Sequence, residues 1–175
     1  GVEFDLHSYK NKLVVHHDPF IDAINFDDWL THYNHSYMFI NIKEEGIENR
    51  VIDSINKTGN DRFLLFDLSF PSIINLSKIG FTKIAMRISK YESINTVFNL
   101  KDKIDWIWLD MFDDEIPIST NNFKKLQSFG MKICIVSPEL QGRDQSSLLK
   151  VKSSLELLNI KPDAVCTKYD NLWTH

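Results

Sequence analysis

Two carboxylates near the start of the chain have the spacing of a shared site. Glu3 and Asp5 lie two positions apart in the apolar run Val2–Leu6, which has the composition of a β-strand. Alternation along a strand places both side chains on one face. Adjacent carboxylates repel each other unless a proton or a cation lies between them, and an oxygen-bound divalent cation is one solution. The other solution is neutralisation by a lysine or arginine inside the fold.

A pair of histidines closes the next apolar run. His16 and His17 end the run Leu13–His17 and precede Asp18-Pro19. Alternation sends the two rings to opposite faces, so only one can face Glu3 and Asp5. An imidazole that titrates near neutral pH can accept and donate protons. The pair can equally be the start of a turn.

Further polar side chains stand where later apolar runs end. Asn41 and Lys43 share a face, and Lys43 can meet a phosphate oxygen or pair with Glu3 or Asp5. An arginine among carboxylates can bind an anionic substrate or only neutralise them. The charged residues at or just past these ends are Asp67, Arg87, Asp110, Glu139 and Lys168. Of these, Arg87, Glu139 and Lys168 are the candidates for substrate binding.

Apolar runs of strand length recur along the chain with helical stretches between them. Several runs are apolar almost throughout, which is typical of parallel strands covered on both faces. Leu13–His17 follows its predecessor too closely for a crossover helix and is predicted to be a hairpin arm. The predicted strands are Val2–Leu6, Leu13–His17, Met38–Ile42, Phe63–Asp67, Lys83–Ile88, Trp106–Asp110, Ile133–Val136 and Ala164–Thr167.

Helix-ending signals agree with this division. Gly80 and Gly130 each follow a helical stretch and precede a strand, the usual place of a left-handed helix cap. Ser119 or Thr120 can cap the helix that ends near Gly130. The polar residues that close the strands from Lys43 onward recur every 20 to 30 residues. This rhythm suits a doubly wound sheet or a barrel.

The absence of nucleotide-binding motifs favours the barrel. No Gly-x-Gly-x-x-Gly or P-loop sequence follows any predicted strand. Charged strand ends would instead converge at one mouth of a (β/α) TIM-type barrel. Only seven parallel strands are found, and the chain begins inside a strand. We therefore expect one domain, residues 1–175, in the form of a barrel incomplete at the N-terminus, with its first strand and helix absent.

Composition narrows the classes of partner. The chain has 175 residues, 43% of them hydrophobic, which is enough for a core. A net charge of −4 without a basic stripe disfavours nucleic-acid binding, and no apolar run is long enough for a transmembrane segment. Cys134 and Cys166 lie in apolar runs and are expected to be buried hydrophobic residues in a reducing, cytoplasmic setting. Nothing in the sequence bears on the oligomeric state.

The combination of motifs resembles the glycerophosphodiester phosphodiesterase family, a family of (β/α) barrels related to phosphatidylinositol-specific phospholipases. Residues 1–6 (Gly-Val-Glu-Phe-Asp-Leu) and 13–19 (Leu-Val-Val-His-His-Asp-Pro) resemble its Glu-x-Asp strand and its apolar run ending in His-Asp-Pro. Residues 40–43 (Ile-Asn-Ile-Lys) resemble its Glu-x-Lys strand. Residues 69–70 (Ser-Phe) and 163–167 (Asp-Ala-Val-Cys-Thr) resemble later strand ends. The resemblance is strongest in the first twenty residues.

The resemblance implies metal-dependent hydrolysis of a phosphodiester, with a role in lipid metabolism. Glu3 and Asp5 would bind a divalent cation, Mg²⁺ or Ca²⁺, with Asn41 at the position of a third ligand. Lys43 would neutralise the phosphate, and His17 would be one of two histidines for acid–base catalysis. A substrate hydroxyl next to the phosphate would attack it, and water would then open the cyclic phosphate.

Three departures from the family pattern shape the expectation. The family's other histidine belongs to a His-Arg-Gly motif that this sequence does not contain, so the chain as given is expected to be impaired. Asn41 replaces a carboxylate. Only 26 positions separate His17 from Lys43, where the family carries an insertion that encloses glycerol. A small-molecule phosphodiester with a larger alcohol, such as a phosphorylated glycan or head group, is therefore the expected substrate.

Two other functions stay open. A barrel isomerase or aldolase would use Lys43 or Lys168 as its amine. A degenerate barrel would bind a phosphorylated ligand without catalysis, which the neutral Asn41 makes credible.

Overall fold

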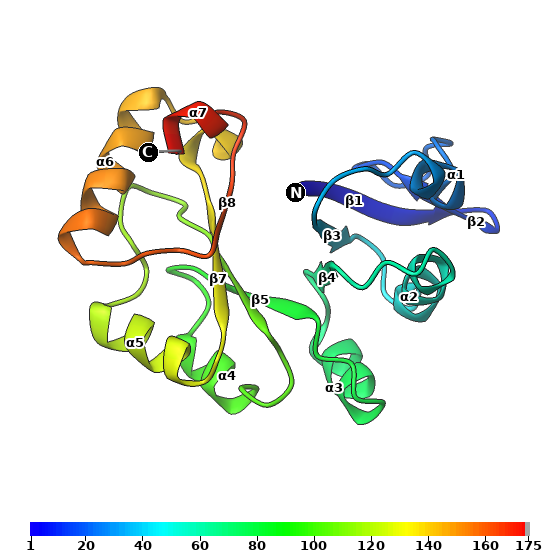
Figure 1. Cartoon of the computed structure of the whole chain (residues 1–175), viewed down its shortest axis with the longest axis horizontal. Helices are drawn as coiled ribbons and strands as arrows, with labels where there is room; N and C mark the ends of the chain where they lie inside the picture. Colours follow the sequence, from blue (N-terminus) through cyan, green and yellow to red (C-terminus); the bar gives the residue numbers. More distant parts are fainter. Residues whose placement is uncertain (174–175) are drawn as a thin grey trace. The chain divides into compact units, whose positions relative to one another are not determined.

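The chain forms two compact units. The computed structural model describes residues 1–173. Contacts group them into a first unit, Gly1–Ala85, and a second unit that begins at Met86 (Figure 1). The expectation of one domain over residues 1–175 stays a prediction.

All eight predicted strands are present within a few residues of their expected bounds. The first unit contains β1 (Val2–Tyr9), β2 (Lys12–Val15), α1 (Phe26–Thr31), β3 (Met38–Ile42), α2 (Glu48–Lys57), β4 (Phe63–Phe66) and α3 (Phe70–Lys78). Strand β5 (Ile84–Ile88) crosses the boundary. The second unit continues with α4 (Ile94–Asn99), β6 (Trp106–Leu109), α5 (Thr120–Ser128), β7 (Lys132–Val136), the 3₁₀ helix η1 (Pro138–Gln141), α6 (Gln145–Leu157), β8 (Ala164–Cys166) and α7 (Asp170–Trp173).

The strand order favours the predicted barrel type over a doubly wound sheet. The order is β2-β1-β3-β4-β5-β6-β7-β8, and from β1 to β8, apart from the β2 hairpin arm, spatial neighbours follow the order of the chain. A doubly wound sheet would reverse direction at a switch point. The fold is thus mixed α/β, with a singly wound order that is consistent with an incomplete (β/α) barrel.

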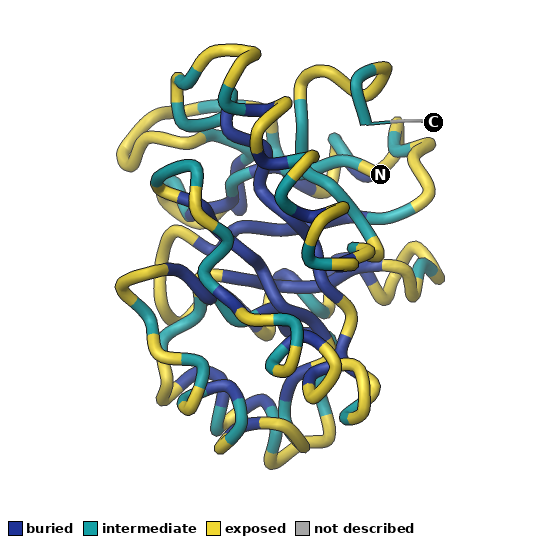
Figure 2. The backbone as a smooth tube through the Cα atoms, turned by 90° about the vertical axis from the view of Figure 1, so that its left-hand side faces the viewer, coloured by how far each residue is buried: buried dark blue, intermediate teal, exposed yellow. Residues whose placement is uncertain are grey.

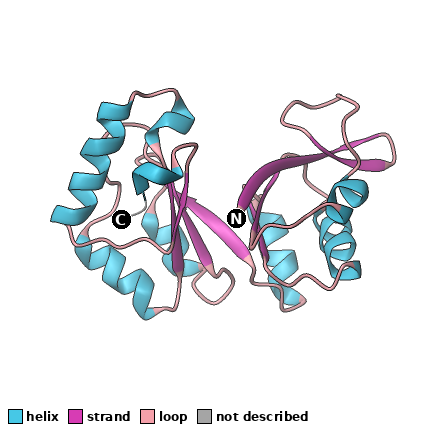
Figure 3. Ribbon diagram, turned by 45° about the horizontal axis from the view of Figure 1, so that its top comes forward, coloured by secondary structure: helices cyan, strands magenta, loops and turns pink. Residues whose placement is uncertain are grey.

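A hairpin begins the first unit. Strand β2 pairs antiparallel with β1, from Leu6 opposite Val15 to Tyr9 opposite Lys12, which confirms the predicted hairpin arm. The tight turn at Lys10 uses a positive φ of 54°. Because this pairing extends β1 to Tyr9, the strand is three residues longer than predicted. Both strands of the hairpin are visible in Figure 3.

The helix-ending signals are confirmed. Gly80 and Gly130 adopt φ values of 79° and 77° just after α3 and α5, a conformation in which a Cβ would be strained. The Ser119 side chain accepts a hydrogen bond from the Asn122 backbone N–H at the start of α5. Cys134 is buried and Cys166 is half-buried. Within residues 1–173, no helix is both long and apolar enough to cross a membrane.

One face of each group of strands is covered by helices. Helices α1 to α3 lie on one side of the strands in the first unit, and α4 to α6 do so in the second (Figure 1). The strands are the buried part of the backbone, while the outer helix turns are exposed (Figure 2). The Phe4 ring packs on Trp29 and Phe26 of α1, with centroids 4.4 and 5.9 Å apart. Since Phe4 faces α1, alternation turns its neighbours Glu3 and Asp5 away from that helix.

The buried strands make a direct stability test possible. Leu65 in β4 is wholly buried, whereas Leu157 at the end of α6 is 88% exposed. Leu65→Ala should lower the free energy of unfolding by about 2–5 kcal/mol, because it removes buried methyl groups and leaves a cavity. Leu157→Ala is the control and should change it by less than about 0.5 kcal/mol in urea unfolding. An equal loss in both variants would contradict the packing described for β4.

Candidate functional site

The first unit brings four of the predicted site residues together. Strand pairing places Asp5 of β1 directly opposite Asn41 of β3, so the two side chains share a face with Glu3. The Lys43 Nζ atom lies 3.1 Å from the Asp5 Oδ1 atom in a half-buried ion pair. Lys43 therefore neutralises one of the two carboxylates, which is one of the roles that its sequence position allowed.

Glu3 is the electrostatically strained member of this group. Burial and the neighbouring Asp5 carboxylate raise the pKa of Glu3 from 4.5 to about 7. The Asp67 carboxylate acts in the same direction, while the charges of Lys43 and His17 lower the Glu3 pKa. Asp67 follows β4 directly and holds a positive φ of 59°, which is uncommon for a residue with a side chain. Two carboxylates thus act on Glu3, and a proton or cation at Glu3 relieves this repulsion.

Asn41 presents an unsatisfied oxygen on the same face. Its side chain is buried, and its Oδ1 atom has no hydrogen-bond partner. A buried oxygen without a partner is unfavourable unless a ligand completes it. Two carboxylates and an amide oxygen are the hard oxygen donors that Mg²⁺ and Ca²⁺ take, so the residue types fit such a cation. Among the residues that the structure describes, no group of three or more His, Cys, Asp or Glu side chains could hold a metal ion.

Both histidines of the pair lie near the carboxylates. The His16 backbone N–H donates to the Asp5 carbonyl oxygen at 3.1 Å, so His16 stands opposite Asp5 just beyond the end of β2. The His17 side chain is 71% exposed and contacts the Asp18 carboxylate, yet its charge reaches Glu3 and lowers the pKa of that residue. The assignment of proton transfer to His17 stays a prediction.

A third histidine was not expected. His7 shares the face of Glu3 and Asp5 by alternation, is only 2% exposed, and has an Nε2 atom without a hydrogen-bond partner. Its ring meets the His16 ring edge-on, with centroids 6.4 Å apart. The signal in the sequence was its position two residues after Asp5. It was overlooked because the predicted strand ended at Leu6.

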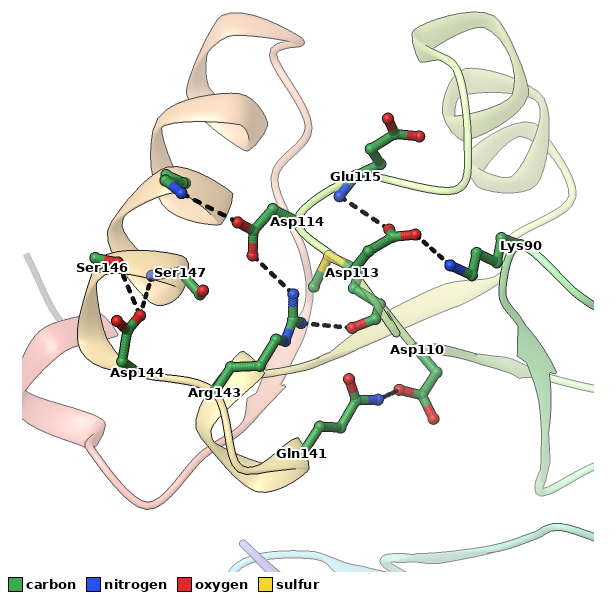
Figure 4. Close-up of polar contacts among 12 residues, drawn as sticks. Lys90, Asp110, Asp113, Asp114, Glu115, Gln141, Arg143, Asp144, Ser146 and Ser147 are labelled. Carbon is green, nitrogen blue, oxygen red and sulfur yellow. Dashed lines mark hydrogen bonds and ion pairs between the residues drawn. The ribbon is translucent and has the colours of Figure 1, made fainter.

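Arg87, a predicted substrate-binding residue, belongs to the second unit and already has a carboxylate partner. The Arg87 Nη1 atom lies 3.7 Å from the buried Asp110 carboxylate at the end of β6. Gln141 of η1 donates a hydrogen bond to the same carboxylate (Figure 4). Arg87 thus neutralises Asp110 in this structure, and its contact with a substrate stays a prediction.

Glu139 and Lys168 are joined to each other. The Glu139 carboxylate accepts hydrogen bonds from the Ser137 and Thr167 hydroxyls and, at 2.9 Å, from the Lys168 backbone N–H. Burial raises the pKa of Glu139, but these hydrogen bonds outweigh it and hold the pKa below the ordinary value. Glu139 therefore links the segments that follow β7 and β8. A substrate-binding role for Glu139 or Lys168 stays a prediction.

The acidic loop that follows β6 contains Asp113 and Asp114, and basic side chains form ion pairs with it. Arg143 donates to the Asp114 carboxylate at 2.8 Å and to the Met111 carbonyl oxygen, and Lys90 pairs with Asp113 at 2.6 Å (Figure 4). These contacts join the loop to the segments after η1 and β5. Sequence reasoning did not identify them, because the partners are 23 to 32 residues apart.

The raised pKa of Glu3 has a measurable consequence for stability. Between pH 4.5 and about 7, the folded chain keeps a proton that the unfolded chain has released. The contribution of Glu3 to the free energy of unfolding is therefore fully present below pH 4.5, falls as the pH rises to about 7, and is level above it. Urea unfolding in EDTA across this range should show that Glu3→Gln removes this decline. Glu156→Gln, an exposed control, should keep it; a decline unchanged by Glu3→Gln would contradict the assignment.

Comparison with known proteins identifies the fold. A protein assigned as a glycerophosphoryl diester phosphodiesterase from Agrobacterium tumefaciens superposes with a TM-score of 0.64 at 15% identity, covering 93% of this chain and 79% of that one. A glycerophosphoryl diester phosphodiesterase from Parabacteroides distasonis superposes with a TM-score of 0.63 at 10% identity, covering 93% and 70%. No curated protein and no sequence family matches the chain. The chain therefore has the fold of these phosphodiesterases, which confirms at the level of structure the resemblance of its sequence motifs.

Proposed function

We propose that this chain carries the metal-binding and proton-transfer residues of a phosphodiester hydrolase of the glycerophosphodiester phosphodiesterase type. One observation carries the proposal: Glu3, Asp5 and the unpaired Asn41 oxygen share a face with Lys43 in the fold of solved phosphodiesterases. Two half-buried carboxylates, of which Asp5 raises the pKa of Glu3, are suited to a cation, and a lysine beside them is suited to a phosphate.

Glu3, Asp5 and Asn41 are the residues that would hold a divalent cation, Mg²⁺ or Ca²⁺. When bound, the cation would act as a Lewis acid toward a phosphoryl oxygen and an attacking hydroxyl. Lys43 would weaken its ion pair with Asp5 and form a contact with a non-bridging oxygen of the phosphate. This exchange becomes favourable once a cation has taken over the neutralisation of Asp5.

His17 would move the proton of the attacking group. As the oxygen of a substrate hydroxyl forms its bond to phosphorus, its proton passes to the imidazole; the bond from phosphorus to the leaving alcohol breaks, and the leaving oxygen takes a proton from the imidazole by way of solvent water. The exposure of His17 and its electrostatic effect on Glu3 are compatible with a ring that borders both the solvent and the carboxylates.

The substrate would be a phosphodiester of a polyol, with a free hydroxyl beside the phosphate. A glycerophosphodiester, a phosphorylated glycan and a lipid head group share this chemistry. The short segment between His17 and Lys43 would leave room for an alcohol larger than glycerol.

A second function is favoured by one observation. Asn41 is neutral where a carboxylate would bind a cation more tightly, so the chain could bind a phosphorylated ligand through Lys43 without turnover. An aldolase or isomerase mechanism through Lys43 is less compatible with the structure, because the amine is engaged by Asp5.

Measuring hydrolysis with and without a metal ion distinguishes the hydrolase function from the binding function. With Mg²⁺ or Ca²⁺, the chain should hydrolyse glycerophosphocholine or bis(4-nitrophenyl) phosphate, and EDTA should abolish the activity. Asp5→Asn should lower kcat/KM by about 100-fold or more through loss of a ligand, while Asp22→Asn, an exposed control, should retain it. Binding of glycerol phosphate in calorimetry without hydrolysis by any cation would instead support the binding function.

Asn41 offers a gain-of-function test. Asn41→Asp should tighten Mg²⁺ binding by about 10-fold, because it adds a third negative ligand to the same face. Without a cation it should lower the melting temperature, since a third charge then joins Glu3 and Asp5. Asn49→Asp adds the same charge on the exposed surface of α2 and should do neither. Calorimetry and thermal unfolding measure the two effects, and unchanged Mg²⁺ affinity in Asn41→Asp would oppose the proposed ligand set.

A further inference from the structure

Asp18 contacts both histidines of the pair, and it does so through different groups. Its carboxylate oxygen Oδ1 lies 2.9 Å from the His17 Nδ1 atom. Its backbone N–H donates to the His16 Nδ1 atom at 3.0 Å. One residue therefore presents an acceptor to one imidazole and a donor to the next.

The contact with the carboxylate determines the form of the His17 ring. An ionised carboxylate can only accept, so His17 Nδ1 must carry a hydrogen and donate it. In a neutral imidazole the other nitrogen, Nε2, then holds a lone pair and can take a proton. The hydrogen bond from His17 keeps the pKa of Asp18 below its ordinary value, and the charges of His16 and His7 add to this. The Asp18 carboxylate is thus ionised at neutral pH, where it can accept the hydrogen bond from His17.

The backbone contact has the opposite effect on His16. A backbone N–H can only donate, so His16 Nδ1 accepts and the neutral ring carries its hydrogen on Nε2. The Asp18 carbonyl oxygen lies farther from the same Nδ1 atom, at 3.3 Å, and competes less well. Of the two neutral rings, His17 is therefore the one whose Nε2 atom can take a proton.

We propose that Asp18 is a positioning residue that fixes opposite tautomers on this pair and thereby prepares His17 as the general base. The proposal rests on the proposed phosphodiester hydrolysis. His17 Nε2 takes the proton of the attacking hydroxyl as its oxygen bonds to phosphorus. The bond from phosphorus to the leaving alcohol breaks, and the leaving oxygen takes a proton from His17 Nε2 by way of solvent water. When water attacks the cyclic phosphate, its proton passes to His17 Nε2, and the oxygen released from phosphorus takes a proton back by way of solvent water, which returns the ring to its starting form.

The position of the pair relative to the carboxylates is consistent with this role of His17. His16 stands opposite Asp5 through its backbone hydrogen bond, and His17 is near enough to lower the pKa of Glu3. Alternation turns the two rings to different faces, so the role of base falls to one ring of the pair and not to both. Both contacts with Asp18 are at the surface, and their effect is on tautomer and orientation more than on stability.

Nitrogen NMR tests the tautomers without any assay of activity. In chain labelled with ¹⁵N-histidine at a pH where the rings are neutral, His17 should show a protonated Nδ1 and His16 a protonated Nε2, with His16→Gln and His17→Gln assigning the signals. Asp18→Asn should shift His17 toward the Nε2-protonated form, because an amide can donate to Nδ1. Asp22→Asn, in the same segment, should leave both rings unchanged. A protonated Nε2 on His17 in the unmodified chain overturns the proposal.

Kinetics tests the catalytic consequence. Asp18→Asn should lower kcat by on the order of 10- to 1,000-fold with KM nearly constant, as expected when a base is held in the wrong tautomer. Asp22→Asn should match the unmodified chain. Equal kcat in the two variants would overturn the positioning role even with the expected tautomers. Absence of hydrolysis by the unmodified chain would instead overturn the proposed function and leave the tautomers to be judged by NMR.

Discussion

The repulsion between Glu3 and Asp5 is the constraint to which the rest of the site responds. Placing two carboxylates on one half-buried face of β1 makes full ionisation unfavourable, and Glu3 shows this in its raised pKa. Lys43 compensates one charge, and His17 acts on the other from a distance. Asn41, opposite Asp5, adds an oxygen without adding charge. The arrangement is that of a site kept near neutrality until a cation or phosphate changes the balance.

Backbone pairing is what brings these groups together. The parallel register of β1 with β3 places Asp5 beside Asn41, and the antiparallel register with β2 places His16 beside Asp5. A shift of one residue in either pairing would turn the polar side chains toward α1. The packing of Phe4 on Trp29 opposes such a shift, because it buries the other face of the same strand. The packing of Phe4 on one face of β1 therefore determines which polar side chains lie together on the opposite face.

Much of the fold could be predicted from local signals. The apolar runs, the glycines after α3 and α5, and the Ser119 cap are each defined by a few neighbouring residues, and all are present. The grouping of Glu3, Asp5, Asn41 and Lys43 followed from alternation along two strands. Other features depend on segments distant in sequence or on strand ends that differ from the predicted ones. These features are the burial of His7, the hydrogen bonds that Glu139 accepts and the pairing of Arg87 with Asp110. No pattern within one element predicts such contacts.

The hairpin of β1 and β2 also has a consequence for the order of folding. It holds Glu3, Asp5, His7 and the two following histidines within the first 17 residues, and its pairing needs only a tight turn at Lys10. Contacts between residues so close in sequence form on the microsecond scale, far faster than pairing across a crossover helix. The acidic and imidazole groups would thus meet before β3 arrives with Asn41 and Lys43. A nascent chain would expose a compact, ionisable hairpin that the rest of the first unit later encloses.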